Sequence, residues 1–578
     1  MLVSSQERKR TDTPAILVCI IFVVVLFGVI TYTFFNGTIY RFIYGYDDCG
    51  NVCGLKNDGN PFKSCGNTDK TLLPYTLLNA TQNTQAPSKF TTESSCVKSC
   101  KDFPGYIEVA NRCLLKGSED QIEENFFEKV AEDFRTSWFH ILISVVVAMV
   151  FSYILLILFR YATKYVIWII YIGIVILISI FSILALVMFF VMKSKGGKEE
   201  ESAYTFLIVS VICAIVALIF GVMLYFFRKR IKLVIQLFKE ASKALSDVPL
   251  IVVEPLLTFI ALLFTFILFI YFTLIIQSSG TPKNIKNAEG YEKVMFEKDF
   301  VMEAAFYINF IAFFWFASFI LGCQHFIIAS TVCQWFFTRA KTELNSPIKR
   351  AFSHLLNFHI GSVCLGSIII TIARIIRMIL ESIINSAKKS ENAVAKIAAL
   401  CFSFIMEQLE QFLQYLVRNG YIIVALDGTP LFDSGKKAFE LMKKNLVDVV
   451  ALNQIGDFVL VLGRLFVVLI SGFVCFELTM ELNYPWIPIT LAVIFSFLVV
   501  HCFMTVFEMT LDTIFICFCE DCELNDGMTR PFFMSREMME VMIELKSAAG
   551  GEFDFLKKDD AEGGNVRPLI PQNFKFSD

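Results

Sequence analysis

The sequence is poor in charged residues and lacks the short motifs by which many soluble enzymes hold nucleotides or metals. Only 18% of its 578 residues are charged, the formal net charge is −3, and histidine occurs five times. No P-loop, HExxH, GxSxG or dinucleotide fingerprint lies in a context that would support it. We therefore expect no enzyme activity, no cofactor, no metal site and no nucleic-acid partner, and an ATP-driven pump is disfavoured.

The patterns of a voltage-gated channel are also missing from the sequence. No segment carries an arginine at every third position, and no filter motif is repeated along the chain. The classes that remain are a secondary transporter or facilitator, a channel or scramblase without voltage gating, and a membrane receptor.

Long apolar runs are abundant instead. Hydrophobic residues make up 56% of the chain, with 61 phenylalanines beside five tryptophans and fifteen prolines, and the mean hydropathy is +0.62. A bilayer core needs about 20 helical residues, and the runs reach this length without the short alternation of a β-barrel. We predict an all-α fold: a polytopic transmembrane helical bundle of about ten spans, with a first helix at 14–35 and the other spans within 138–519.

Basic residues set the predicted orientation. Arg8, Lys9 and Arg10 lie in the polar segment 1–13, directly before the first span, and positively charged flanks stay in the cytosol. Three later connections are basic and fall on the same side: 160–164, 228–243 and 338–350. We therefore expect a cytosolic N-terminus at 1–13 and a cytosolic C-terminal tail at 520–578.

The loop 36–137 is polar and holds an even set of cysteines: Cys49, Cys53, Cys65, Cys96, Cys100 and Cys113. Such a set on the outer side predicts a small extracellular domain stapled by disulfides, although the sequence does not choose among the pairings. Zinc binding through the two pairs spaced four residues apart, 49 with 53 and 96 with 100, is the alternative. Asn79 begins a glycosylation sequon in the same loop, which fits an extracellular location.

The segment 396–425 has more than one interpretation. Glu407, Glu410 and Arg418 interrupt its apolar helical pattern, so it crosses the bilayer or enters it as a re-entrant helix, or the stretch 354–380 takes that re-entrant role instead. We favour ten crossings, which place both termini in the cytosol. That count moves Arg374 and Arg377 toward the outer side, against the usual charge bias.

The last apolar run carries three ionisable residues on one helical face. His501, Glu508 and Asp512 are spaced seven and then four residues apart, so they fall near one line along a helix. Ionisable groups at membrane depth are costly in lipid, and such a face indicates a functional site. The alternative is that the two carboxylates lie at the cytosolic end and reach water.

Aromatic side chains gather in the span 305–337, where Phe314 and Trp315 lie within a run of four aromatic residues. Aromatic faces attract quaternary ammonium groups, although such rings also serve as packing surface.

Glu254 and Pro255 predict a kink in their helix, which either lines a cavity or serves only for packing. Small residues between Gly361 and Ser367 predict close helix packing.

Several stretches together resemble the choline transporter-like proteins, the solute carrier 44 family. They are CEDCELNDGMTRPFFMS at 519–535, YGYDDCGNVCG at 44–54, RNGYIIVALDGTPLFDSGKKAFELMKKN at 418–445, DFVLVLGRL at 457–465 and LGCQHFIIASTVCQWFF at 321–337. The resemblance extends from the first loop to about residue 540.

This resemblance implies sodium-independent transport of choline and ethanolamine, by a facilitator or a choline/proton antiporter that supplies phospholipid synthesis. The location it implies is the plasma membrane or, in some members, the mitochondrial membrane. We expect Trp315, Phe314, Glu508 and Asp512 to bind the cation, and His501, Glu508 and Asp512 to couple protons. Glu254 departs from the apolar residue expected in the family at that position. The alternatives are a receptor or scaffold that does not transport, and a channel.

Overall fold

The computed structural model describes residues 7–57, 68–82, 90–109, 111–115, 126–195, 198–286, 292–388, 393–445, 449, 452–482, 484–525 and 530–548. Cys65 and most of the predicted tail 520–578 lie outside these residues.

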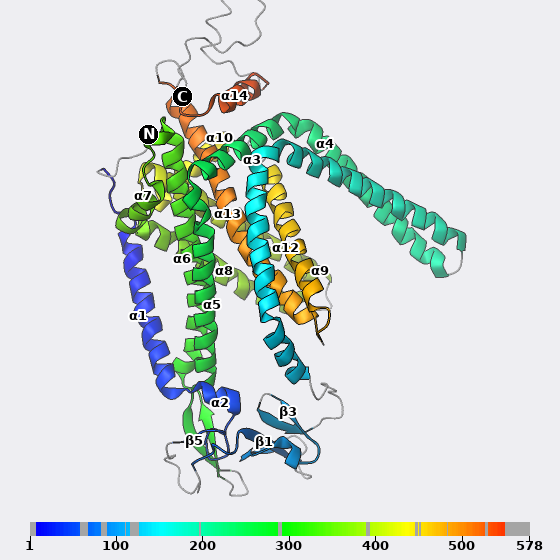
Figure 1. Ribbon diagram of the computed structural model, residues 1–578, viewed down its shortest axis with the longest axis vertical. Coiled ribbons are helices and arrows are strands. Elements are labelled where there is room, and N and C mark those ends of the chain that lie inside the picture. The colour runs from blue at the N-terminus through cyan, green and yellow to red at the C-terminus, as the bar shows by residue number, and fades with distance from the viewer. Residues whose placement is uncertain are drawn as a thin grey trace, which may run out of the picture.

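The chain is mainly helical, as predicted, and its long helices run roughly side by side in a bundle (Figure 1). The helices are α1 (Thr13–Asn36), α2 (Ile39–Tyr44), α3 (Phe126–Lys195), α4 (Lys198–Asp247), α5 (Glu254–Ser278), α6 (Phe300–Phe337), α7 (Pro347–His354), α8 (Ile360–Lys388), α9 (Ala393–Asp427), α10 (Leu431–Lys444), α12 (Phe458–Thr479), α13 (Trp486–Leu524) and α14 (Arg536–Ala548). Single π-helical turns precede α8 at Leu355–His359 and α12 at Asn453–Asp457.

Seven helical segments among the described residues are long and apolar enough to cross a membrane. They are Thr13–Asn36, Arg135–Phe159, Pro249–Ser278, Phe300–Phe337, Pro347–Ser382, Ile455–Thr479 and Trp486–Leu524. Two shorter apolar segments, Ile178–Ser194 and Tyr204–Ile219, lie in α3 and α4. The polytopic helical fold is therefore confirmed, while the count of about ten spans is not.

The cysteine-rich loop folds as a small sheet at the end of the bundle opposite the two chain termini (Figure 1). Its strands lie in the order β2-β1-β4-β3. The strands are β1 (Tyr75–Gln82), β2 (Phe90–Val97), β3 (Tyr106–Val109) and β4 (Arg112–Leu115), and a separate hairpin contains β5 (Thr281–Lys286) and β6 (Glu292–Glu297). The loop packs on this hairpin, since the Val294 amide donates to the Asp48 carbonyl at 2.8 Å and the Arg41 guanidinium lies 3.5 Å from the centre of the Phe296 ring.

Disulfides join Cys53 to Cys96 and Cys100 to Cys113, and Cys49 is also disulfide-bonded. The prediction of a disulfide-stapled loop is therefore confirmed. The zinc alternative is wrong, because its cysteines have no thiolates left to coordinate a metal.

Helix α3 differs from the expectation that 160–164 connects two spans. Residues 160–164 continue the helix instead of forming a loop. A straight helix of 70 residues would be about 105 Å long, more than three bilayer cores. Figure 1 shows how this length is accommodated: α3 leaves the bundle at its upper end and continues beside α4 as an arm that projects from the bundle.

The uncertain segment 396–425 forms most of α9, which lies antiparallel to α8. Arg374 on α8 contacts Glu410 on α9 at 3.4 Å, and Tyr421 on α9 contacts the carbonyl of Val363 on α8. The two helices therefore run in opposite directions. Arg377 pairs with Glu410 at 2.9 Å. These ion pairs give a physical reason why two arginines occur where the charge bias would exclude them.

The N-terminal segment before α1 is held against the start of α8. The Thr11 amide donates to the Phe358 carbonyl at 2.9 Å, and the Ser362 hydroxyl donates to Asp12 at 2.6 Å. A Cβ atom on Gly361 would lie 2.4 Å from the Thr11 carbonyl oxygen, so only glycine allows this approach. The buried Arg8 donates to the Ala425 carbonyl at the end of α9 at 2.6 Å.

The predicted close packing around Gly361–Ser367 is also seen at Gly366, which faces the buried ring of Tyr421 on α9. A Cβ atom at this glycine would lie 2.1 Å from the Tyr421 hydroxyl and 2.8 Å from Cζ. A Cβ atom added to Gly322 on α6 would lie 3.2 Å from the same hydroxyl oxygen. The ring of Tyr421 is therefore held where α6, α8 and α9 meet.

We expect Gly366→Ala to destabilise the protein by about 1–3 kcal/mol, because the added methyl group overpacks a rigid aromatic contact. Adding Tyr421→Phe should restore part of the lost stability, since it removes the hydroxyl that makes the shortest contact. Thermal unfolding of the purified variants in detergent measures both effects. Equal melting temperatures for Gly366→Ala and the wild type would contradict this packing.

Candidate functional site

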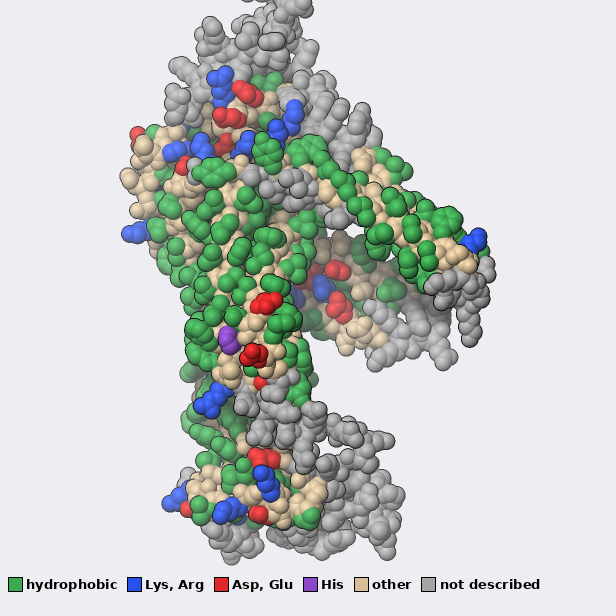
Figure 2. All heavy atoms as spheres, turned by 45° about the vertical axis from the view of Figure 1, so that its right-hand side comes forward, with side chains coloured by type: hydrophobic (Ala, Val, Ile, Leu, Met, Phe, Trp, Pro, Cys, Tyr) green, Lys and Arg blue, Asp and Glu red, His purple; other side chains and the backbone are tan. Residues whose placement is uncertain are grey.

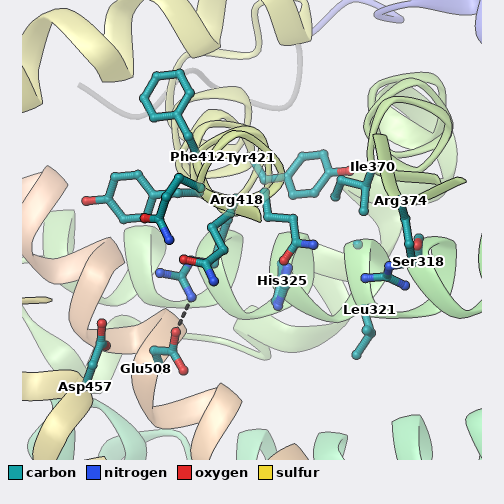
Figure 3. A pocket seen from close by; sticks show the side chains of 15 residues that line it. Ser318, Leu321, His325, Ile370, Arg374, Phe412, Arg418, Tyr421, Asp457 and Glu508 are labelled. Carbon is teal, nitrogen blue, oxygen red and sulfur yellow. Dashed lines mark hydrogen bonds and ion pairs between the residues drawn. The ribbon is translucent and has the colours of Figure 1, made fainter. Parts of the chain in front are cut away.

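A cavity of about 530 Å³ opens between α6, α8, α9, α13 and the π-helical turn before α12. Figure 3 shows that its polar side chains point inward from these different elements. Its lining residues are Ser318, Leu321, Gly322, His325, Ile370, Arg374, Gln408, Gln411, Phe412, Gln414, Tyr415, Arg418, Tyr421, Asp457 and Glu508. Helix α9 contributes more of the lining than any other element, and its residues 408, 411, 414, 415, 418 and 421 recur at helical spacing.

An ion-pair cluster of Arg418, Arg464, Glu508 and Asp512 lies at one wall of this cavity. Arg418 on α9 contacts Glu508 directly and Asp512 at 2.9 Å. Arg464 on α12 contacts the other Glu508 oxygen at 2.8 Å. Because Glu508 and Asp512 are four residues apart, one guanidinium reaches both carboxylates.

Asp457 brings a third carboxylate to this wall. It ends the π-helical turn Asn453–Asp457, and π turns inside helices are frequent at functional sites. In Figure 3 its side chain lies beside Glu508 and points into the cavity. Asp457 lies within electrostatic range of both Arg418 and Arg464. Two guanidinium groups therefore face three carboxylates, which leaves one negative charge when all five groups are ionised.

Two histidines lie near the cluster. His325 on α6 lines the cavity and lies within electrostatic range of Arg418 and Glu508. His501 on α13 stacks on Phe497 with 6.0 Å between the ring centres, and it lies within electrostatic range of Glu508. The structure thus brings the predicted His501, Glu508 and Asp512 to one region, and only Glu508 of these three is among the lining residues.

The predicted aromatic pair occupies a different environment. The indole of Trp315 is buried against α1 and α8: it donates to Ser367 at 3.1 Å and meets the Phe22 ring edge-on at 5.2 Å. Trp315 and Phe314 are not among the cavity-lining residues. Phe314 lies at the cavity edge, because the Arg374 guanidinium is 5.7 Å from its ring centre. The assignment of both rings to the substrate stays a prediction.

Glu254 and Pro255 lie where a 3-10 turn at Pro249–Val252 passes into α5, which begins at Glu254. Both residues fall within the candidate span Pro249–Ser278. The Glu254 carboxylate accepts a hydrogen bond from Thr258 at 2.7 Å. The kink stays a prediction.

Sequence reasoning missed the residues that face the acidic pair. In the sequence, Arg418 only interrupts an apolar pattern, and no pattern singles out Arg464 or Asp457. One sequence pattern does indicate this site. Gln408, Gln411 and Arg418 share a helical face with Tyr415 and Tyr421. A polar face on an otherwise apolar helix indicates a contact with another polar face.

Comparison with known proteins relates the chain to choline transporters. The family described as plasma-membrane choline transporter matches residues 211–523. The chain is 30% identical to choline transporter-like protein 1 of Torpedo marmorata over 94% of each chain. It is 28% identical to choline transporter-like protein 1 of Xenopus laevis over 98% of this chain and 96% of that protein. It is 27% identical to choline transporter-like protein 3 of Bos taurus over 97% of this chain and 96% of that protein.

The cluster predicts how its members depend on one another. Arg418→Met should lower the free energy of unfolding by about 3–5 kcal/mol, because it leaves the buried Asp512 without its counter-charge. Adding Asp512→Asn should recover part of this loss, since Arg464 still neutralises Glu508. Thermal unfolding in detergent compares the single and double variants. A double variant whose losses simply add would show that the two side chains are not coupled.

Proposed function

This chain belongs to the plasma-membrane choline transporter family, and we propose that it carries choline and similar cationic amines across the bilayer. The observation that supports the cargo most directly is the set of three carboxylates beside the cavity, Asp457, Glu508 and Asp512, which holds one negative charge more than Arg418 and Arg464 when all five groups are ionised. A monovalent cation would balance that charge without removing either arginine from its ion pairs.

Asp457 is the carboxylate that we propose as the direct partner of the ammonium group. Glu508 is shared by two guanidinium groups, and Asp512 contacts Arg418. Asp457 instead points into the cavity from a short π-helical turn. In this proposal Glu508 and Asp512 contribute to binding through their negative charge and by holding Arg418 in place.

We propose that the aromatic side chains of the site come from α6 and α9, which both line the cavity. Tyr415 on α9 lines the cavity, and its ring face suits a quaternary ammonium group. Phe314 would join it at the cavity edge. Trp315 would reach the cation only in another state of the transport cycle, after α6 moves against α1 and α8.

We further propose that transport is independent of sodium and proceeds as facilitated movement or as exchange of choline for protons. His501 is the group most suited to proton exchange near neutral pH, because imidazole changes charge in that range. Glu508 and Asp512 would transmit the effect, since changes in their ion pairs alter the charge at the cavity wall. Trp315, Phe314, Glu508 and Asp512 thus remain our substrate residues, with Asp457 added.

The wider biological proposals follow from the family. Ethanolamine would be a second cargo, and both amines would supply phospholipid synthesis. The plasma membrane is the proposed location, with the mitochondrial membrane as a second one. Asn79, in strand β1 of the extracellular sheet, is the proposed glycosylation site.

The direct test is uptake of labelled choline by cells that lack their own choline transporters, with and without this chain. Saturable uptake that persists without sodium and is inhibited by excess ethanolamine would support every part of the cargo proposal. Absence of uptake by protein shown at the cell surface would overturn it and favour a receptor or scaffold. Uptake that does not saturate and is accompanied by conductance would indicate a channel.

We expect Asp457→Asn to raise the apparent Michaelis constant for choline about tenfold or more, since it removes the excess charge that we assign to the cation. Asp457→Glu should retain part of the affinity because the charge remains. The matched control is Asp433→Asn, which removes an exposed carboxylate from α10 outside the cavity. An unchanged Michaelis constant in Asp457→Asn would remove this residue from the site.

We also expect His501→Gln to flatten the dependence of choline uptake on external pH on the acidic side of neutrality, where an imidazole gains its charge. His325→Gln is the companion variant, because this second imidazole lies near the same cluster. Uptake is measured at matched surface expression. A pH profile identical to the wild type in His501→Gln would contradict its role in proton coupling.

A further inference from the structure

A second pocket lies at the end of the bundle that carries the chain termini. It has a volume of about 320 Å³ and is lined by α4, the end of α6 and the segment that leads into α14. Its lining residues are Glu240, Lys243, Trp335, Phe336, Arg339, Ala340, Lys341, Thr342, Phe533, Ser535 and Met538. The disulfide-bonded sheet is at the opposite end (Figure 1), and disulfides form outside the cytosol, so this pocket faces the cytosol.

Two basic segments converge on this pocket. Lys243 ends the basic segment 228–243, and Arg339 and Lys341 belong to 338–350. The bundle therefore assembles three cations from connections that are far apart in the sequence. Figure 2 shows lysine and arginine side chains at this end of the molecule, interspersed with aspartate and glutamate, above a middle zone that is mainly hydrophobic.

Aromatic rings hold two of these cations. The Lys341 ammonium lies 4.4 Å from the centre of the Trp335 ring, and the Arg339 guanidinium lies 4.8 Å from the centre of the Phe533 ring. Lys341 also donates to the Trp335 carbonyl and, at 2.7 Å, to the Thr338 carbonyl. The positions of both cationic groups are thus set by the fold before any ligand arrives.

The neighbouring carboxylates are already engaged. Glu240 accepts hydrogen bonds from Ser535 at 2.5 Å and from Gln236 at 3.1 Å. Asp247 accepts a hydrogen bond from the Trp335 indole at 2.8 Å. Among the lining residues, three positive groups face one carboxylate, so the pocket carries an excess of positive charge.

The environment of Lys341 is consistent with an excess of positive charge in the pocket. Burial is the main cause that lowers the pKa of its ammonium group to about 8, and the positive charge of Lys243 lowers it further. The carboxylates of Asp247 and Glu240 act in the opposite direction but do not offset these two causes. An anion placed between the cations would stabilise the charged form of Lys341.

We propose that this pocket binds a phosphate monoester at the cytosolic face of the transporter. The dianionic group would lie between Lys243, Arg339 and Lys341, where basic groups at a bilayer surface commonly receive anionic head groups. Two sources share this chemistry: a lipid of the inner leaflet, such as phosphatidic acid, and a soluble phosphomonoester, such as phosphocholine. The proposal concerns a site separate from the central cavity and does not depend on the identity of the transported cation.

The test uses the full chain and two probes. In the soluble arm, phosphocholine is titrated onto protein in neutral detergent, and binding is followed by calorimetry. In the lipid arm, the protein is placed in phosphatidylcholine nanodiscs with or without phosphatidic acid, and bound lipid is measured by native mass spectrometry. Saturable binding in either arm supports the proposal and identifies the source, while no binding in both arms overturns it.

Variants distinguish this pocket from general attraction to a basic surface. Lys243→Gln and Arg339→Gln should each weaken binding about fivefold. Lys341→Met should do the same, although this lysine also binds carbonyl groups at the end of α6, so the two exposed residues keep the test independent of folding. The matched control is Lys239→Gln, which removes an exposed charge on α4, one turn away and outside the pocket. Equal weakening in the control would overturn the proposal.

Binding of phosphocholine should also weaken as the pH rises. Lys341 is mostly charged at pH 7 and mostly neutral at pH 9, because its pKa is about 8. Affinity for phosphocholine should therefore fall between these two pH values in the wild type and fall less in Lys341→Met. An equal fall in both proteins would separate the pH effect from Lys341 and contradict its place in the site.

Discussion

A charged group inside a bilayer must be paired or reach water, and this constraint organises the centre of the protein. The ion-pair cluster of Arg418, Arg464, Glu508 and Asp512 satisfies it by drawing α9, α12 and α13 together. Glu410 does the same for the two arginines of α8. The cavity lies between these two groups of ion pairs, so its polar lining and its position have one cause.

The two ends of the bundle are held by different interactions. At one end, disulfides and a short sheet close the loop that connects α1 to α3. At the opposite end, hydrogen bonds between the segment before α1 and its neighbours fix the start of α8 and the end of α9.

The arm formed by α3 and α4 presents an apolar surface. Large apolar side chains such as Phe181 and Leu218 remain exposed on it, and the two helices are joined by reciprocal hydrogen bonds between Ser182 and Ser210, each at 2.9 Å. Small hydroxyl-bearing residues allow close helix contact where no hydrophobic force favours association in lipid. The arm is therefore suited to a bilayer without further protein contacts.

Properties that depend on one segment at a time follow from the amino-acid sequence alone. Apolar length predicted the long helices, the even set of cysteines predicted the stapled loop, and the spacing of Glu508 and Asp512 placed both carboxylates on one face. The tertiary structure decided which faces meet: it turned Arg418 toward this pair, brought Asp457 beside them and packed Trp315 between α1 and α8. The physical reason is that helical periodicity fixes the direction of a side chain relative to its own axis, whereas its partner is chosen by how the remaining helices pack.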